Sequence, residues 1–169
     1  EKINSGLATI DGNMARDVSR AHLMEADRKT ALSRIHAAKT FEDLAECDLV
    51  IEAATENEEV KRKIFGRLCS ALKPEALLGS NTSSISITRL ASTTDRPEKF
   101  IGIHFMNPVP RMQLVELIRG IATEDATFQA ARELIAKLGK TSTVAEDFPA
   151  FIVNRILLPM IKEAIYTLY

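Results

Sequence analysis

The part of the sequence that most constrains the fold runs from residue 48 to residue 105, where short apolar stretches alternate with helical patterns. Residues 48–54 are a largely apolar run that contains Val and Ile, which is typical of a strand buried on both faces. Asn57 then caps one helix and Ser86 caps a short one that runs through Ala91, and further strands are expected at residues 76–81 and 100–105. Strands that alternate with helices predict a parallel α/β sheet covered on both faces.

Helical patterns flank this alternation on both sides. Residues 1–20 place an apolar side chain at every third or fourth position, as an amphipathic helix does, and a second helix is expected over residues 25–35. Further along, a helix that starts at Thr123 is followed by a β-branched strand at residues 141–145. We expect a last, largely apolar helix to begin at Asp147.

A hairpin is expected within residues 101–118, where two apolar β-prone runs flank a loop interrupted by prolines. His104 and Glu116 lie equally far from its midpoint at Pro110, so an antiparallel ladder would place their Cβ atoms about 5 Å apart. A His held by a carboxylate keeps one ring nitrogen as a donor and leaves the other as a base for a hydroxyl proton. The alternative is a half-buried His beside an edge-strand Glu, and the pattern alone favours it because satisfied histidines outnumber catalytic ones.

Charge and cysteine usage exclude several classes of protein. The 169 residues carry 22 Lys and Arg and 23 Asp and Glu, interspersed along the chain, so no nucleic-acid or polybasic membrane footprint is present. Cys47 and Cys69 stand in unrelated contexts, which argues against a disulfide framework and for a reducing compartment. No signal peptide and no cluster with metal-ligand spacing is found. We therefore expect a protein of the cytoplasm, with an organelle matrix as the open alternative, that holds no metal and binds neither nucleic acid nor membranes.

Five spaced motifs resemble those of the L-3-hydroxyacyl-CoA dehydrogenases, and within that family those of the bacterial 3-hydroxybutyryl-CoA dehydrogenases. The match covers essentially the whole chain, and five motifs in order are far more specific than any one of them. The motifs are Val50-Ile-Glu-Ala-Ala-Thr-Glu-Asn-Glu-Glu-Val-Lys, Ser80-Asn-Thr-Ser-Ser, His104-Phe-Met-Asn-Pro-Val-Pro, Leu114-Val-Glu and Phe151-Ile-Val-Asn-Arg.

The resemblance implies a fold, a reaction and a partner. Members of the family oxidise the 3-hydroxyl of a short-chain acyl-CoA with NAD in fatty acid metabolism, including β-oxidation. The implied fold is a partial Rossmann-type doubly wound sheet over residues 1–146, followed over residues 147–169 by the first helix of an all-α dimerisation domain. An acyl-CoA substrate and a homodimer formed through that helical region are expected. The cofactor is NAD, with NADP as an open alternative.

The resemblance also assigns roles to four catalytic residues. His104 resembles the general base of the family, and Glu116 resembles the carboxylate that orients it. Ser83 resembles a residue that hydrogen-bonds the substrate beside the nicotinamide ribose, although without the family a turn at a strand end is the favoured interpretation. Asn154 resembles the amide that holds the reacting oxygen of the substrate. Its alternative is a buried structural amide, because an Asn within an apolar helix needs a partner.

Four further positions, together with Ser83, resemble cofactor contacts of the family. Ala53, Glu56 and Lys61 match positions along the span from adenine to nicotinamide, and Asn107 matches one that reaches the nicotinamide side. Independently, Glu56 follows the carboxyl end of an expected parallel strand, where open α/β sheets bind ligands. The alternative for Glu56 and Lys61 is an exposed charge pair, which the spacing alone favours.

Two departures from the family pattern are visible. Ala150 stands where the family usually has Gly, which costs about 1 kcal/mol if that backbone needs a positive φ. The seven glycines contain no G-x-G-x-x-G, so the first βαβ unit that cradles the cofactor pyrophosphate is missing from these residues, as is most of the helical domain. We therefore expect a polypeptide of these 169 residues alone to be inactive.

The implied mechanism is hydride transfer, in which His104 takes the hydroxyl proton and Glu116 stabilises the imidazolium that forms. One alternative is a non-catalytic relative, crystallin-like or regulatory, although the intact set of catalytic residues argues against a decayed site. Another is a related β-hydroxyacid or sugar dehydrogenase. Several of those use Lys as the acid–base residue, and the motif that begins at His104 is not their pattern.

Overall fold

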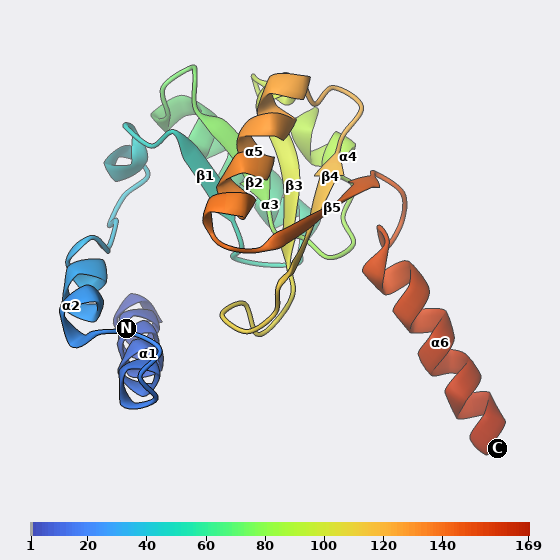
Figure 1. Cartoon of the computed structure of the whole chain (residues 1–169). Helices are drawn as coiled ribbons and strands as arrows, with labels where there is room; N and C mark the ends of the chain where they lie inside the picture. The colour runs from blue at the N-terminus through green and yellow to red at the C-terminus, as the bar shows by residue number, and fades with distance from the viewer. Residues whose placement is uncertain (1) are drawn as a thin grey trace. The chain divides into compact units, whose positions relative to one another are not determined.

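The computed structural model describes residues 2–169, which fold as two units, one up to Thr40 and one from Phe41 to Tyr169. The first unit holds the helices α1 (Lys2–Ser19) and α2 (Glu25–Ser33), which confirms the two helices expected there. Arg28 of α2 ties them together, since its guanidinium donates to the carboxylate of Asp11 on α1. Figure 1 shows this pair of helices in blue.

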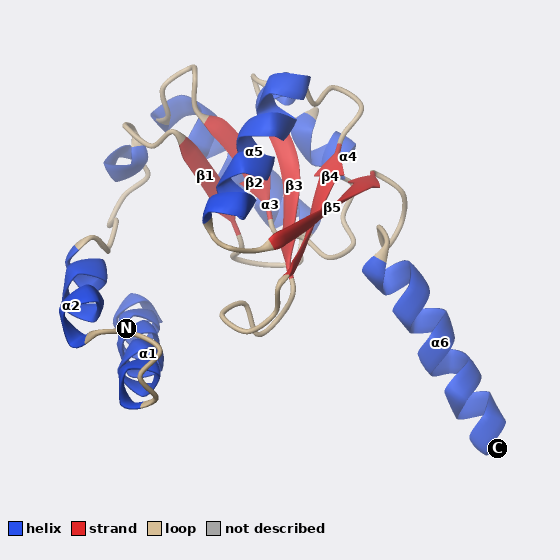
Figure 2. Ribbon diagram, in the orientation of Figure 1, coloured by secondary structure: helices blue, strands red, loops and turns tan. Residues whose placement is uncertain are grey.

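The second unit is built on a five-stranded sheet with the strand order β1-β2-β3-β4-β5 (Figure 2). The first three strands are parallel, β4 runs antiparallel to β3, and β5 is parallel to β4. The sequence prediction of a largely parallel sheet with one antiparallel hairpin is therefore confirmed. The strands are β1 (Leu49–Glu52), β2 (Leu77–Ser80), β3 (Phe100–Phe105), β4 (Leu114–Arg119) and β5 (Thr141–Glu146).

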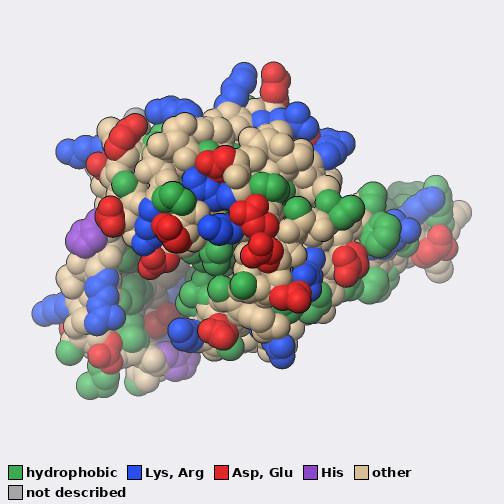
Figure 3. All heavy atoms as spheres, turned by 90° about the horizontal axis from the view of Figure 1, so that it is seen from above, with side chains coloured by type: hydrophobic (Ala, Val, Ile, Leu, Met, Phe, Trp, Pro, Cys, Tyr) green, Lys and Arg blue, Asp and Glu red, His purple; other side chains and the backbone are tan. Residues whose placement is uncertain are grey.

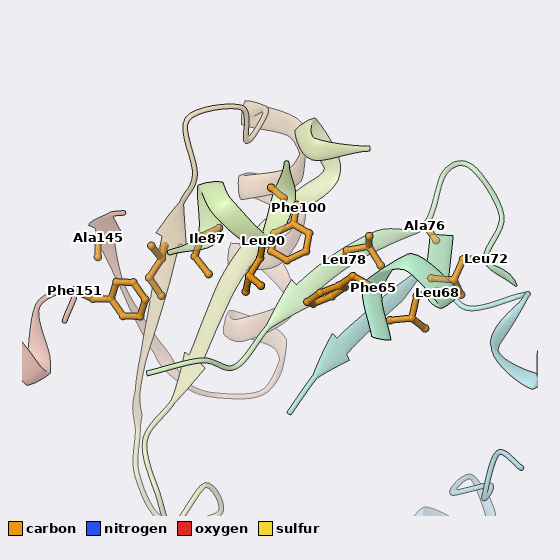
Figure 4. Packing of buried hydrophobic residues seen from close by; sticks show 12 residues of the cluster. Phe65, Leu68, Leu72, Ala76, Leu78, Ile87, Leu90, Phe100, Ala145 and Phe151 are labelled. Carbon is orange, nitrogen blue, oxygen red and sulfur yellow. The ribbon is translucent and has the colours of Figure 1, made fainter. Parts of the chain in front are cut away.

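Helices cover both faces of this sheet. The helices α3 (Glu58–Ala71) and α4 (Ile87–Ala91) pack on one face, and α5 (Asp125–Lys137) packs on the other. Figure 4 shows the core beneath α3 and α4, where Phe65 lies edge-on to Phe100 with ring centroids 4.7 Å apart. Short 3₁₀ turns at Glu42–Leu44 and Pro97–Lys99 complete the unit.

Side chains alternate between the two faces along β3, as the pleat of a strand requires. Phe100 belongs to the core under α3 and α4, whereas Ile101 and Ile103 belong to the core under α5. His104 therefore points to the face that carries α3 and α4. Gly102 lets α4 approach on that face, because a Cβ there would lie only 2.9 Å from the side chain of Ile87.

Side chains cap two helices where the sequence predicted it. The Asn57 side chain accepts from the Val60 N–H at 3.1 Å and begins α3, and the Ser86 hydroxyl accepts from the Arg89 N–H at 3.2 Å and begins α4. Both caps satisfy N–H groups that have no partner within their own helix. The local signals for these two helix starts are therefore confirmed.

The start predicted for the last helix is wrong. The helix α6 (Val153–Leu168) begins at Val153, six residues after Asp147. Asp147 instead caps α4 from a distance, since its carboxylate accepts from the Ser86 hydroxyl at 2.7 Å and the Ile87 N–H at 2.9 Å. The intervening turn contains Ala150 with φ 68° and Phe151 with φ 50°, and consecutive left-handed residues cannot continue a right-handed helix.

The helix α6 leaves large apolar side chains exposed along most of its length, among them Ile156, Leu158 and Ile165. Figure 3 shows hydrophobic side chains, in green, gathered on the arm at the right of that view. Within residues 2–169, no helix is both long enough and apolar enough to cross a membrane.

The left-handed backbone at Ala150 gives a first testable prediction. An Ala held at φ 68° is strained by about 1 kcal/mol relative to Gly, so Ala150→Gly is expected to raise the free energy of unfolding by about that amount. Urea denaturation of the two proteins measures it. Ala130→Gly, in the exposed middle of α5, is the matched control and should lower the same quantity by about 1 kcal/mol. A loss of stability in Ala150→Gly would contradict the strain argument.

Candidate active site

His104 and Glu116 form a buried hydrogen-bonded pair at the centre of the second unit. The ladder pairs them directly in register across β3 and β4, and the imidazole Nδ1 lies 2.6 Å from a carboxylate oxygen of Glu116. Glu116 has no exposed surface and His104 is 6% exposed. The contact predicted from the symmetric spacing about Pro110 is confirmed.

The partners of the imidazole fix which nitrogen carries the proton. An ionised carboxylate can only accept, so Nδ1 donates to Glu116 and the Nε2 of a neutral ring is left as an acceptor. The Ser83 hydroxyl lies 3.1 Å from Nε2 and donates to it. His104 thus presents a basic nitrogen next to a hydroxyl, which is the arrangement that proton abstraction from an alcohol needs.

The second oxygen of Glu116 holds the start of α6. It accepts from the Ile152 N–H at 2.9 Å and the Val153 N–H at 2.8 Å, which are among the N–H groups that begin the helix. One residue further, the Asn154 amide donates to the Ser83 carbonyl oxygen at 3.3 Å. The four residues predicted as catalytic therefore lie in one connected network, although they come from the β2–α4 loop, β3, β4 and α6.

Glu56 holds the loop that carries Ser83. Its carboxylate accepts from the Thr82 hydroxyl at 2.7 Å, the Ser83 N–H at 2.8 Å and the Ser84 hydroxyl at 3.2 Å. Partial burial alone would raise the pKa of Glu56. The hydrogen bonds from Thr82 and Ser83, the charge of Lys61 and the Ser84 hydroxyl outweigh it, so the pKa lies below its ordinary value and the group stays ionised at neutral pH.

Lys61 does not form an exposed charge pair, so the simpler alternative weighed for it is wrong. Its side chain is 1% exposed, and its ammonium forms a buried ion pair with Glu52 at the end of β1. The same ammonium lies 3.9 Å from the Glu56 carboxylate. Sequence reasoning missed Glu52, for which the only signal was a single acid within an otherwise apolar strand.

Ala53 and Asn107 occupy the same edge of the sheet. Ala53 is exposed directly after β1, and Asn107 is exposed two residues after the end of β3, in the β3–β4 loop. The Lys140 ammonium braces this loop by donating to the carbonyl oxygens of Val109 at 2.7 Å and Met112 at 2.8 Å. The roles of Ala53 and Asn107 in holding a cofactor stay predictions.

The site lies at the carboxyl ends of β1, β2 and β3, where open α/β sheets bind their ligands. A hydroxyl, an amide and a neutral imidazole form a donor and acceptor set that suits an alcohol carbon beside a nicotinamide. Within residues 2–169 no group of His, Cys, Asp and Glu is arranged to hold a metal ion.

The same residues do not fit the pyrophosphate of a dinucleotide. A pyrophosphate normally binds at a helix N-terminus with free N–H groups, and a carboxylate there repels it. Each of the helices from α2 to α6 begins beside at least one carboxylate. These are Glu25 and Asp27 at α2, Glu58 and Glu59 at α3, Asp147 at α4, Asp125 at α5 and Glu116 at α6.

Comparison with known proteins gives a consistent result. Residues 1–148 match the family described as 3-hydroxyacyl-CoA dehydrogenase, NAD binding domain. A 3-hydroxybutyryl-CoA dehydrogenase of Bradyrhizobium diazoefficiens is 70% identical over 169 residues, which are 100% of this chain and 58% of the relative. A probable 3-hydroxybutyryl-CoA dehydrogenase of Bacillus subtilis is 44% identical over 100% of this chain and 59% of its own length.

Solved structures agree with the sequence relatives. The crystal structure of (S)-3-hydroxybutyryl-CoA dehydrogenase from Ralstonia eutropha superposes with a TM-score of 0.93 at 47% identity, covering 95% of this chain and 57% of that one. The 3-hydroxybutyryl-CoA dehydrogenase from Escherichia coli gives a TM-score of 0.95 at 37% identity, over 98% of this chain and 35% of that one. This chain thus spans less than three fifths of each of these relatives.

Proposed function

Since this chain belongs to the family of 3-hydroxyacyl-CoA dehydrogenase NAD-binding domains, we propose that it supplies the acid–base half of a 3-hydroxybutyryl-CoA dehydrogenase. The reaction is the NAD-dependent oxidation of the 3-hydroxyl of a short-chain L-3-hydroxyacyl-CoA to the 3-oxoacyl-CoA. The observation that carries the proposal is the buried His104–Glu116 pair, with its free nitrogen 3.1 Å from the Ser83 hydroxyl.

The residues of this chain perform the proton transfer. The imidazole Nε2 of His104 accepts the proton of the substrate 3-hydroxyl while Nδ1 keeps its proton on Glu116. The charge of Glu116 stabilises the imidazolium that forms, and in the reverse direction the imidazolium returns the proton. Ser83 and Asn154 hold the reacting oxygen. A bound NAD would supply the hydride acceptor for the same carbon.

Cofactor contacts are proposed for Ala53, Glu56, Lys61, Ser83 and Asn107. What supports this is that all five follow the carboxyl ends of β1 to β3, or in the case of Lys61 lie against residues that do. Because Lys61 is buried, we propose that it acts on the cofactor through its charge and not through a broad direct contact.

Assembly, location and substrate are proposed from the surface of α6, the cysteines and the relatives. The exposed apolar surface of α6 supports a homodimer formed through this C-terminal helical region. Two cysteines without a disulfide support a cytoplasmic location. As the relatives are dehydrogenases that act on a CoA thioester, the substrate is an acyl-CoA.

A non-catalytic relative of the same fold is the alternative of a different class. It needs neither a base nor an aligned hydroxyl, whereas here every polar atom of the His104–Glu116 pair is either bonded or aimed at Ser83. The other alternative, a dehydrogenase with a Lys acid–base residue, is disfavoured. The buried lysine beside the site, Lys61, is already paired with Glu52.

A chimaera tests the function. This chain is joined to the segments of the Bradyrhizobium diazoefficiens relative that lie outside the matched region. With acetoacetyl-CoA and NADH it is expected to oxidise NADH at about 1–10³ turnovers per second, the usual range of enzymes, followed at 340 nm. The natural relative is the positive control. A folded chimaera that binds NADH and turns over nothing would favour the non-catalytic alternative.

A further inference from the structure

A cluster of three charged residues lies directly beneath the loop that carries Ser83. Glu52 ends β1, Lys61 lies one turn into α3, and Glu56 lies between them in the sequence. The ammonium of Lys61 contacts Glu52 and lies 3.9 Å from Glu56. The mechanism described above assigns nothing to Glu52.

Glu52 is fully engaged at both oxygens. One oxygen accepts from the Ala54 N–H at 2.7 Å, and the other accepts from Lys61 and from the Ser80 hydroxyl at 3.3 Å. The carboxylate is thus fixed to β1, to β2 and to α3 at once. Because it is 5% exposed, it holds its place without competition from water.

A buried ion pair of this kind is a poor source of stability. Removing two charges from water costs several kcal/mol, and apolar residues of similar size often fill such a space equally well. The pair therefore points to a task of geometry. The second carboxylate near Lys61, that of Glu56, shows which geometry is meant.

Lys61 connects the buried pair to the loop of Ser83. Glu56, its second carboxylate neighbour, is about half exposed and would be free to turn into solvent if nothing held it. It instead takes three hydrogen bonds from residues 82–84, one of them from the Ser83 N–H at 2.8 Å. Without Glu52, Glu56 would be the only carboxylate within 4 Å of the Lys61 ammonium and would be drawn toward it.

We propose that Glu52 is a positioning residue for Ser83. It holds the ammonium of Lys61 back from Glu56, so that Glu56 keeps the Ser83 N–H and the Ser83 hydroxyl stays aimed at Nε2 of His104. The sequence of contacts runs from Glu52 through Lys61 and Glu56 to Ser83. This inference rests on the proposed function, because it assigns Ser83 a place in the reaction.

A double-mutant cycle in the chimaera separates positioning from general structure. Glu52→Gln keeps the shape and an acceptor oxygen but removes the charge that holds Lys61. It is expected to lower kcat/KM for acetoacetyl-CoA about 10- to 100-fold, the effect of a displaced positioning contact. In the Ser83→Ala background, where the hydroxyl to be positioned is absent, the same change should alter kcat/KM by less than about twofold.

Two further proteins control this cycle. Asp48→Asn removes a different ion pair, the one between Asp48 and Lys73 at the opposite end of β1. It should leave kcat/KM unchanged. The charge reversal E52K/K61E restores an ion pair but sets a carboxylate beside Glu56. The double variant should be as inactive as Glu52→Gln. Glu52→Asp, which keeps the charge, should retain at least part of the activity.

Amide hydrogen exchange gives a readout that does not depend on activity. In Glu52→Gln the Ser83 N–H is expected to lose its protection from exchange. The Val60 N–H, which donates to the Asn57 side chain, should stay protected. Because exchange needs no turnover, it tests the positioning even if the proposed reaction is wrong.

The outcomes divide cleanly. Loss of Ser83 protection together with a cycle that collapses in Ser83→Ala supports the proposal. Unchanged protection, equal losses in both backgrounds, or full activity in E52K/K61E would overturn it. If Glu52→Gln does not fold, Glu52→Met, which removes the same charge, is taken through the same cycle and the same exchange measurement, with the same criteria.

Discussion

Replacement of His104 by Gln in the chimaera is expected to lower kcat by about 10²–10⁴-fold while leaving the affinity for NAD nearly unchanged. The Gln amide fills much of the space of the imidazole and can still donate to Glu116. It cannot accept a proton from an alcohol at neutral pH, so the step that His104 performs is lost. His104 contacts Glu116 and Ser83, and its proposed role is at the reacting hydroxyl, which is why NAD binding is expected to be spared.

Steady-state kinetics at saturating substrate and calorimetry with NAD measure the two halves of this prediction. His36→Gln, in the other unit of the chain, changes a histidine outside the network and serves as the control. Turnover at the unsubstituted rate in His104→Gln would show that the base is elsewhere.

A polypeptide of these 169 residues alone is expected to bind NAD too weakly for calorimetry to detect, whereas the chimaera binds it. The five helix starts from α2 to α6 are already beside carboxylates, so they offer no N-terminus for the pyrophosphate. Losing two or three charge-assisted hydrogen bonds of about 1.5–3 kcal/mol each weakens binding by several powers of ten. The same polypeptide should not oxidise NADH with acetoacetyl-CoA.

The control for this comparison is the fold itself. The exchange protection of the β3 and β4 amides should be the same in the bare chain and in the chimaera, so that weak binding reports a missing site and not an unfolded one. Micromolar NAD binding by the bare chain would refute the argument, and would mean that Glu56 and Lys61 contribute far more than a partly exposed carboxylate and a paired ammonium should.

The contact at the centre of the site could be predicted because it is local in a specific sense. An antiparallel hairpin maps distance along the chain onto distance across the ladder, so equal separation of His104 and Glu116 from Pro110 was enough to pair them. The caps at Asn57 and Ser86 were readable for the same reason, since a cap and the N–H it accepts lie within three residues.

The contacts that were missed join residues far apart in sequence or hide a charge in an apolar pattern. Asp147 looked like the start of its own helix, but its carboxylate is used by α4, about 60 residues earlier. Glu52 received no role from the sequence, because the sequence does not show that Lys61 turns inward from α3 to meet it. Tertiary hydrogen bonds determine the roles of Asp147 and Glu52, and local sequence propensity does not predict such bonds.

Glu116 divides its two oxygens between the imidazole and the first N–H groups of α6, which has a thermodynamic consequence. Seating α6 and orienting the base are linked equilibria that share one carboxylate. By reciprocity, whatever favours the seated helix by some factor must favour the oriented imidazole by that same factor, and the reverse also holds. Anything that packs against α6 and seats it would therefore also favour the oriented imidazole without touching it.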